Sequence, residues 1–414
     1  MRILMIAPEP FFEPRGTPFS EFHRIRALTE LGHEVDLVTY PFGQPVTMPG
    51  MRIFRCLRPP FVRRVKIGPS LAKVPLDLLL ACTAMRRALV NRYDAVHSHE
   101  EGGVIGVIVA GLMRVPHLYD MHSSLPQQLT NFAFSGSRSL RALFSAIERF
   151  MIRRSRVVVV ICPSLEETVR HIEPAANTVL IENAPGSVED VPSGTVVGNI
   201  RRSLAPSGSD HRLVLYTGTF EAYQGLDLLL SAMALVKQSV PTARLALVGG
   251  KPDQIRLARE EARNAGVDDI TTFAGEQTAA AIPAYLQAAD VLVSPRSRGT
   301  NTPLKIYQYL RSGTPIVATR LLTHTQVLND ETAFLRTATP EDFAAGIIDA
   351  LRDRDRAATI GRNALHLANT KYSYEAYVDR TRHACDLLWT DAPAPYGRRD
   401  TLGADRRVHP KDVA

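Results

Sequence analysis

The chain has 414 residues, a hydrophobic content of 45% and a formal net charge of +7 at pH 7. This length exceeds what one ordinary hydrophobic core supports, so we expect two domains. No apolar run reaches the roughly 20 residues of a membrane-spanning helix, and Glu9 and Pro10 interrupt the apolar start too early for a signal peptide. The four cysteines are widely scattered, which argues against a disulfide framework or a zinc site and indicates reduced thiols in the cytoplasm.

The basic residues gather in two segments of the first half. They are Arg55, Arg58, Arg63, Arg64, Lys66 and Lys73, and then Arg149, Arg153, Arg154 and Arg156. This pattern favours an anionic partner, either a phosphorylated substrate or a membrane surface. Aromatic residues do not alternate with the basic ones as stacking platforms would, so we expect no nucleic acid. An ordinary solvated surface remains the other interpretation.

Strand and helix patterns alternate along the chain, as is typical of parallel α/β sheets. In the first half we expect strands at 2–7, 33–40, 94–99, 116–122, 157–163 and 178–183, and helices at 20–31, 75–90, 103–113 and 139–154. In the second half we expect strands at 212–218, 243–250, 270–275, 291–295 and 315–319, with helices at 226–237, 254–265, 279–288 and from 302 onward. The two series predict two doubly wound sheets, with ligands bound between them.

A drop in hydrophobicity over 187–210, with added Pro, Gly and Ser, divides the two series. We therefore expect an N-terminal domain at 1–190, an interdomain linker region at 191–210 and a C-terminal domain at 211–370. A C-terminal helix at 371–390 is expected to return to the first domain. The tail at 391–414 lacks apolar periodicity and is expected to be disordered.

The segment 294–319 is the most informative for chemistry. A short apolar strand runs into a glycine-containing loop, which precedes a helix for which Thr302 is a plausible N-cap and Pro303 suits the first turn. The amides of Gly299, Thr300 and Asn301 would then lie at the positive end of the helix, where an oxyanion or phosphate is held. An ordinary strand-loop-helix unit is the alternative.

Two further glycine loops have the same character. Gly218 and Thr219 end a strand in the second half, and Gly225 precedes the next helix. Gly16 precedes a helix after the first strand of the chain. Glycine lets the backbone approach a bulky anion closely. Two such loops facing each other would suit a nucleotide diphosphate that bridges the domains, although each loop alone is weak support.

Taken together, the motifs resemble those of family 4 glycosyltransferases up to about residue 389. The resemblance is carried by EPRGTP, LTELGHEVDLVTY, YDAVHSH, YDMHSSLP, ICPSLEETV, LIENAP, YTGTFEAYQGLDLLL, LALVGG, ITTFAGE and PLKIYQYLRSGTPIVAT. It implies the GT-B fold, in which two doubly wound Rossmann-like domains face a central cleft. The resemblance also implies that the N-terminal domain at 1–190 is acceptor-binding and the C-terminal domain at 211–370 nucleotide-sugar-binding. It also implies retaining transfer of a sugar from a nucleotide-diphosphate donor, with no metal and no cofactor beyond that substrate.

The chain departs from the family at four positions. Thr300 and Gln308 stand where the family often has two glutamates; Gln308 can still hydrogen-bond a ribose, and Thr300 a sugar hydroxyl. Thr219 and Gln224 stand where an arginine and a lysine commonly meet the diphosphate. We expect the missing positive charge to come from Lys305, Arg296 or Arg298.

The resemblance assigns a role to each candidate residue. The predicted catalytic residues are His122 and Lys305. The donor diphosphate is expected to contact Gly16, Gly218, Thr219, Gln224, Arg298 and Lys305, and the donor sugar Gly299, Thr300, Asn301 and Thr302. The ribose and base are expected to contact Gln308, Gly275 and Glu276, and the acceptor side has His99 and Glu100. A structural histidine is the alternative for His122, and a surface lysine for Lys305. The His-x-His spacing of His97 and His99 could chelate a metal ion, but we expect no metal there.

We therefore expect a retaining glycosyltransferase with a nucleotide sugar and a glycan or lipid-linked acceptor as partners, in cell-envelope polysaccharide or glycolipid synthesis. A cytoplasmic location is expected, and the basic segment at 58–73 adds the hypothesis of peripheral attachment to the anionic inner face of the plasma membrane. A binding scaffold with weak catalysis and a sugar-nucleotide epimerase of the same fold remain the alternatives.

Overall fold

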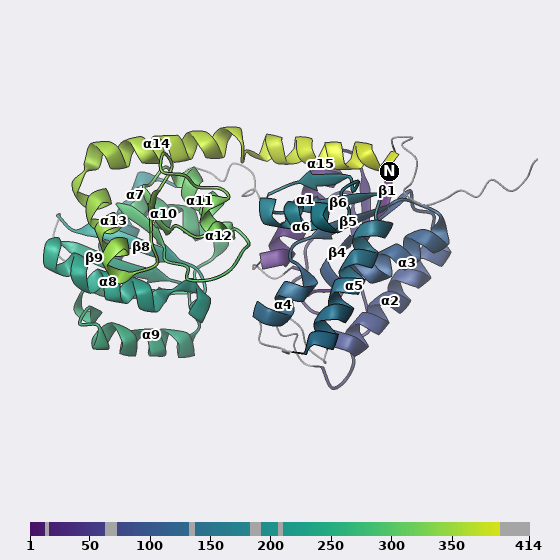
Figure 1. Ribbon diagram of the computed structural model, residues 1–414, viewed down its shortest axis with the longest axis horizontal. Helices are drawn as coiled ribbons and strands as arrows, with labels where there is room; N and C mark the ends of the chain where they lie inside the picture. Colours follow the sequence, from purple (N-terminus) through teal and green to yellow (C-terminus); the bar gives the residue numbers. More distant parts are fainter. Residues whose placement is uncertain (13–15, 63–72, 132–136, 183–191, 206–209, 390–414) are drawn as a thin grey trace, which may run out of the picture.

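Two parallel α/β sheets organise the molecule, one in each of two lobes (Figure 1). The structure, a computed structural model, describes residues 1–12, 16–62, 73–131, 137–182, 192–205 and 210–389. Helices α14 (Arg354–Thr370) and α15 (Tyr374–Trp389) run one after the other along the upper side of Figure 1, from the second lobe to the first. Over these residues, no helix combines the length and the apolar composition needed to cross a bilayer.

The first sheet has the strand order β3-β2-β1-β4-β5-β6-β7 and is parallel throughout. Its strands are β1 (Arg2–Ala7), β2 (Glu34–Thr39), β3 (Met51–Arg55), β4 (Ala95–His99), β5 (His117–Met121), β6 (Val157–Val160) and β7 (Thr178–Leu180). Its helices are α1 (Gly16–Glu30), α2 (Lys73–Val90), α3 (Gly103–Met113), α4 (Leu125–Asn131), α5 (Arg138–Arg154) and α6 (Pro163–Ile172). Helices α1 and α15 cover one face and α2, α3, α5 and α6 the other, so the strands are buried on both faces.

The second sheet has the order β10-β9-β8-β11-β12-β13 and is also parallel. Its strands are β8 (Arg212–Thr217), β9 (Ala243–Val248), β10 (Thr271–Gly275), β11 (Val291–Ser294), β12 (Ile316–Thr319) and β13 (Phe334–Arg336). Its helices are α7 (Gly194–Leu204), α8 (Leu226–Ser239), α9 (Pro252–Asn264), α10 (Ile282–Ala288), α11 (Leu304–Ser312), α12 (Leu322–Thr325) and α13 (Pro340–Arg352), followed by α14. Helices α8 and α13 pack on one face, and α10 and α11 on the other. The prediction of two doubly wound sheets is confirmed.

The strand order reverses at one point in each sheet, and loops at such points commonly bind ligands in doubly wound folds. In the first sheet the reversal lies between β1 and β4, and in the second between β8 and β11. The loop after β8 contains Gly218 and the loop after β11 contains Gly299. The chain order therefore brings two of the predicted glycine loops to the same edge of the second sheet.

Several local features differ from the sequence expectations, among them an edge strand, a helix in the linker region and the cap of α11. Strand β3 was not expected, because its residues are only partly buried at the edge of the sheet and form no apolar run. Part of the region expected as a linker forms α7, which packs against α10. Thr302 does not cap α11: the N-cap is Pro303, whose backbone is extended, and no side chain caps the helix. The expected tail at 391–414 lies outside the described residues.

Helix α15 completes the interior of the first lobe although it follows the second lobe in sequence. Tyr377, Ala384 and Leu388 join the core formed by β4, β5, β6 and α1. Arg24 of α1 donates to the hydroxyl of Thr381 over 3.0 Å, and Arg380 pairs with Glu182. The polypeptide therefore passes between the two lobes twice, once between β7 and α7 and once between α14 and α15.

Candidate active site

The loops at the carboxyl ends of the two sheets contact each other. The side-chain amide of Asn301, in the loop before α11, donates to the backbone oxygen of His122 after β5 over 2.8 Å. The hydroxyl of Thr300 donates to Gln127 of α4 over 3.3 Å. The predicted donor-sugar loop and the predicted catalytic histidine are therefore neighbours across the two lobes.

Gln326 adds a second connection between the lobes. Its side-chain nitrogen donates to the backbone oxygen of Thr300 over 2.6 Å, and its side-chain oxygen accepts from the backbone N–H of Ser164 in α6 over 2.8 Å. The Gly299–Thr302 loop is consequently held from both sides. Sequence analysis missed Gln326 and Gln127, because an isolated glutamine in a helical segment carries no motif.

Lys305 is a buried cation in the first turn of α11. Its Nζ lies 3.4 Å from Oε1 of Gln224 and 3.9 Å from the centre of the Tyr216 ring. In the described part of the chain, no carboxylate forms an ion pair with it. Burial, and then the nearby charge of Arg296, lowers the pKa of Lys305 well below its usual 10.5. An anion brought beside this ammonium would relieve the cost of burying it.

The backbone around Lys305 is shaped by glycine. Gly218 and Gly299 have φ of 136° and 116°, a region that side-chain-bearing residues rarely adopt. A Cβ at Gly299 would lie 2.9 Å from the guanidinium of Arg296. That guanidinium already donates to the backbone oxygens of Arg298 and Asn301. Arg296 therefore fixes the loop, whereas Arg298 is exposed.

The other predicted donor residues lie around this loop at different depths. Thr219 is exposed, and its backbone oxygen accepts from the Tyr216 hydroxyl over 2.7 Å. Gln308 lies one helical turn after Lys305 and is half-buried. Gly275 ends β10 at the sheet edge, with Glu276 exposed beside it. Gly16 begins α1 in the first lobe.

On the first lobe, His122 belongs to a buried polar cluster at the ends of β4 and β5. Asp120 Oδ1 lies 3.2 Å from His122 Nε2, and Asp120 Oδ2 lies 3.0 Å from Arg24 Nε. His99 Nδ1 lies 3.2 Å from His122 Nε2. Burial opposes protonation of His122, but the negative charge of Asp120 outweighs it and raises the pKa of His122 above 6.5. Asp120 thus favours a protonated His122.

The same cluster has a geometry that resembles a metal site. Ligand atoms of His97, His99 and Asp120 all lie within 4.8 Å of one another. However, the guanidinium of Arg24 already pairs with the carboxylate that a cation would need, and all these groups are buried. A divalent ion would have to compete with a fixed positive charge. Arg24, which sequence analysis did not identify, therefore takes the place of a cation beside Asp120.

Two further buried carboxyl groups belong to this cluster, and Oε1 of one of them, Glu21, lies 3.9 Å from His99 Nδ1. Glu21 of α1 is fully buried, and burial, followed by the charge of Glu9, raises its pKa well above 4.5. Burial raises the pKa of Glu100 to about 8. Glu100 accepts from the Ser123 hydroxyl over 3.0 Å and from the Gln128 amide over 3.2 Å. Glu100 lies at the margin of this cluster with 9% exposure, whereas His99 is fully buried.

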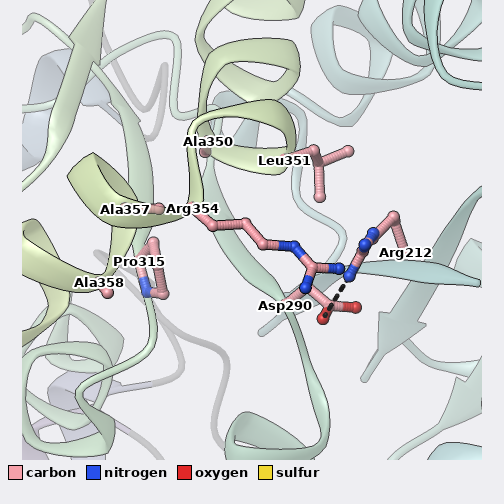
Figure 2. A pocket seen from close by; sticks show the side chains of 8 residues that line it. All are labelled: Arg212, Asp290, Pro315, Ala350, Leu351, Arg354, Ala357 and Ala358. Atoms are coloured by element: carbon pink, nitrogen blue, oxygen red, sulfur yellow. Dashed lines mark ion pairs between the residues drawn. The ribbon is translucent and has the colours of Figure 1, made fainter.

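A separate surface pocket lies at the amino ends of the strands of the second sheet, opposite the end that carries the glycine loops (Figure 2). It is lined by Arg212, Asp290, Pro315, Ala350, Leu351, Arg354, Ala357 and Ala358. Arg212 begins β8, and Asp290 and Pro315 precede β11 and β12, so these residues mark the amino ends of the strands. Lys305 and the glycine loops are at the carboxyl ends. This pocket is not part of the candidate active site.

The two parallel sheets and the loops at their switch points have the arrangement expected of a GT-B glycosyltransferase, and comparisons with known proteins agree. Residues 211–353 match the family described as glycosyl transferases group 1. Residues 23–184 match the glycosyl transferase 4-like domain. The chain belongs to the group 1 glycosyltransferases of family 4.

Curated relatives and solved structures cover most of the chain. It is 24% identical over 388 residues to a sulfoquinovosyl transferase of Arabidopsis thaliana, covering 92% of this chain and 72% of that one. It is 30% identical over 291 residues to the 2-deoxystreptamine N-acetyl-D-glucosaminyltransferase of Streptomyces fradiae, covering 65% of this chain and 66% of that one.

Sucrose-phosphate synthase from Thermosynechococcus elongatus superposes with a TM-score of 0.75 at 20% identity, over 94% of this chain and 99% of that one. HepE from Anabaena, solved with UDP, gives 0.72 at 18% identity, over 93% and 100%. The GT-B prediction is confirmed.

Proposed function

We propose that this enzyme is a retaining glycosyltransferase that moves a sugar from a nucleotide-diphosphate-sugar donor to a glycan or lipid-linked acceptor. The observation that carries the proposal is Lys305, a buried ammonium without a carboxylate partner among the described residues, next to glycine loops at a switch point. Structures of HepE were solved with UDP and with UDP-glucose. A nucleoside diphosphate supplies the anion that Lys305 lacks.

In this proposal the second lobe binds the donor. Lys305 and the backbone amides near Gly218 and Gly299 hold the diphosphate, with Thr219, Gln224 and Arg298 at its margin. Thr300, Asn301 and Thr302 contact the sugar, and Gln308, Gly275 and Glu276 the ribose and base. Because Lys305 provides positive charge at the departing diphosphate, the reaction needs no resident metal or other cofactor. Turnover that survives a chelating agent would support this point.

The first lobe provides the acceptor side. Protonated His122 donates a hydrogen bond to the donor sugar, and an oxygen of the departing diphosphate accepts the proton of the attacking acceptor hydroxyl on the same face. Glu100, at the edge of the buried cluster, contacts the acceptor. His99 is fully buried, so we assign it to positioning His122 rather than to direct contact.

The acceptor is proposed to belong to cell-envelope polysaccharide or glycolipid synthesis in the cytoplasm, at the inner face of the plasma membrane. A phosphatidyl-myo-inositol mannosyltransferase of Mycobacterium tuberculosis, named for a lipid acceptor, is 24% identical over 85% of this chain. Membership of the family favours transfer over the epimerase and binding-scaffold alternatives.

The test combines a thermal-shift panel of nucleoside diphosphates and nucleotide sugars with an assay for released nucleoside diphosphate. A ligand at 100 times its dissociation constant stabilises the folded state by about 2.7 kcal/mol. Lys305→Met is expected to lose most of that shift, whereas Lys237→Met, which removes a surface ion pair with Asp269, should keep it. Retention is checked by the anomeric configuration of the product. A full shift in Lys305→Met would contradict the proposed site.

A further inference from the structure

A buried histidine lies behind the glycine loops of the second sheet. His324 belongs to α12, which in Figure 1 lies at the side of the second lobe that faces the first, and its side chain is fully buried. Its Nδ1 lies 2.8 Å from the backbone oxygen of Thr319, at the end of β12. Its Nε2 lies 2.8 Å from Oγ of Ser294, at the end of β11. The imidazole therefore joins the carboxyl ends of two neighbouring strands.

These two contacts determine which ring nitrogen carries the proton. The backbone oxygen of Thr319 can only accept a hydrogen bond, so Nδ1 of His324 is the donor. Burial lowers the pKa of His324 to about 3, and the charges of Lys305 and Arg296 act in the same direction, so the ring is neutral near pH 7. Nε2 then carries no proton and accepts from the Ser294 hydroxyl.

The hydroxyl of Thr319 extends this network to the loop before α11. Its Oγ1 lies 3.1 Å from His324 Nδ1 and donates to the backbone oxygen of Arg296 over 2.6 Å. The N–H of the same peptide unit, which belongs to Ser297, donates to the backbone oxygen of Tyr223 over 3.1 Å. Because a trans peptide is planar, its C=O and N–H point in opposite directions. The Arg296–Ser297 peptide is therefore held from both sides.

Tyr223 belongs to the other glycine loop, which follows β8. Its neighbour Gln224 accepts from Lys305 Nζ over 3.4 Å. The next residue, Gly225, packs so closely on the β11 loop that a Cβ there would lie 2.1 Å from the backbone oxygen of Pro295. The peptide held from both sides thus lies between the two loops and beside Lys305. A shift of this peptide would displace both loops.

We propose that His324 is a positioning residue for the donor, which acts through Thr319 to fix the two glycine loops in the arrangement that binds a nucleoside diphosphate. Thr323 of the same helix supports the loop further along, because its hydroxyl donates to the backbone oxygen of Asn301 over 2.6 Å. Loops fixed before binding lose less conformational freedom when the ligand arrives, so affinity is higher. The identity of the ligand rests on the proposed function, whereas the support of the loops depends on these contacts alone.

Calorimetric titration of the full chain with UDP, GDP and ADP tests the proposal. His324→Leu removes both hydrogen bonds of the ring and should weaken the nucleoside diphosphate that binds the unchanged protein by about tenfold or more. His324→Asn, whose amide can still donate to Thr319, should weaken it by less than about threefold. Thr319→Val, which removes only the hydroxyl between His324 and Arg296, should reproduce the loss and carries the test if His324→Leu does not fold.

His117 provides a matched control. It is also a buried imidazole between two hydroxyl groups, with Nε2 2.7 Å from Oγ of Ser98 and Nδ1 2.9 Å from Oγ of Ser155. However, it begins β5 in the first lobe, away from the glycine loops. His117→Leu should lower Tm about as much as His324→Leu and leave the affinity for the nucleoside diphosphate unchanged.

Two measurements on the empty protein require no ligand. Nitrogen NMR of the histidine-labelled chain should find His324 protonated at Nδ1 only. Hydrogen exchange of the peptide that contains Ser297 should be faster in His324→Leu, because its amide loses the fixed partner, and should be unchanged in His117→Leu.

Three results would overturn the proposal: a proton on Nε2 of His324, equal nucleotide affinities in His324→Leu and His117→Leu, or no recovery in His324→Asn. If none of the three nucleoside diphosphates binds the unchanged protein, the proposed function is contradicted and exchange at Ser297 decides. Faster exchange in His324→Leu then leaves the positioning role standing, and unchanged exchange removes it.

Discussion

Asn301 of the second lobe donates its side-chain amide to the backbone oxygen of His122 of the first lobe over 2.8 Å. Gln326 supports the same loop by bonding to Thr300 on its own lobe and to Ser164 on the other. We call Asn301 and Gln326 the interlobe clasp. The clasp couples the approach of the two lobes to the shape of the Gly299–Thr302 loop, which is proposed to hold the donor sugar.

Loss of the clasp should slow turnover more than it weakens nucleotide binding. Loss of one hydrogen bond costs about 1 kcal/mol. An increase of that size in the activation free energy lowers the rate about fivefold. We expect Asn301→Ala and Gln326→Leu each to lower kcat by that factor or more, while the thermal shift by nucleoside diphosphate changes little. Gln326→Glu, which keeps the acceptor for Ser164, should recover part of the rate. Equal losses in kcat and in nucleotide affinity would indicate a merely structural role.

Nucleoside diphosphate binding should be coupled to proton uptake through Lys305. Burial lowers the pKa of Lys305 in the empty enzyme, and a nearby diphosphate raises it again, so the bound state holds more protons. Uptake should therefore increase as the pH rises through the lowered pKa. Calorimetry over a series of pH values, in buffers of different ionisation enthalpy, measures this proton uptake. Lys305→Met should show none, and uptake that persists in this variant would assign the proton to another group.

Removing Arg24 should destabilise the first lobe strongly. Arg24 is 3% exposed and pairs with Asp120, so Arg24→Met removes a permanent positive charge from beside a buried carboxylate. Breaking one partner of such a pair costs about 3–5 kcal/mol. The exposed pair between Arg256 and Glu260 provides the control, because Arg256→Met should cost less than about 1 kcal/mol. Denaturant unfolding measures both, and similar costs would show that Asp120 is neutralised in another way.

The stability of the protein should respond to pH through Glu100. Its pKa is about 8 in the folded protein against an ordinary 4.5. Between these values the unfolded chain loses the proton while the folded one keeps it, so stability falls as the pH rises through that window. Glu100→Gln mimics the protonated carboxyl and removes this fall. Its Tm relative to the unchanged protein should therefore rise from acid to mildly alkaline pH, and a constant difference would contradict the assignment.

The sequence was sufficient for most strands of the sheets, because strands buried on both faces leave apolar runs such as that of β6. The edge strands β3 and β13 were not expected. It also located the glycine loops, since Gly218 and Gly299 need backbone angles that favour glycine. The contacts that organise the buried polar cluster around His122 could not be predicted from the sequence. Arg24 and Asp120 are 96 positions apart, and only the packing of α1 on the sheet brings them together. The helix α7 was missed because its Gly and Ser content resembles that of a loop.

Because Tyr377, Ala384 and Leu388 of α15 fill the interior of the first lobe, that lobe is built from two stretches of the chain, one before and one after the second lobe. During synthesis, its interior stays incomplete until α15 has left the ribosome, long after the strands of this lobe have emerged. A fragment cut between the lobes would lack these side chains and expose the apolar surface that they cover. For this enzyme, an isolated first lobe therefore requires α15 to be supplied, either as a peptide or by joining it through a new connection.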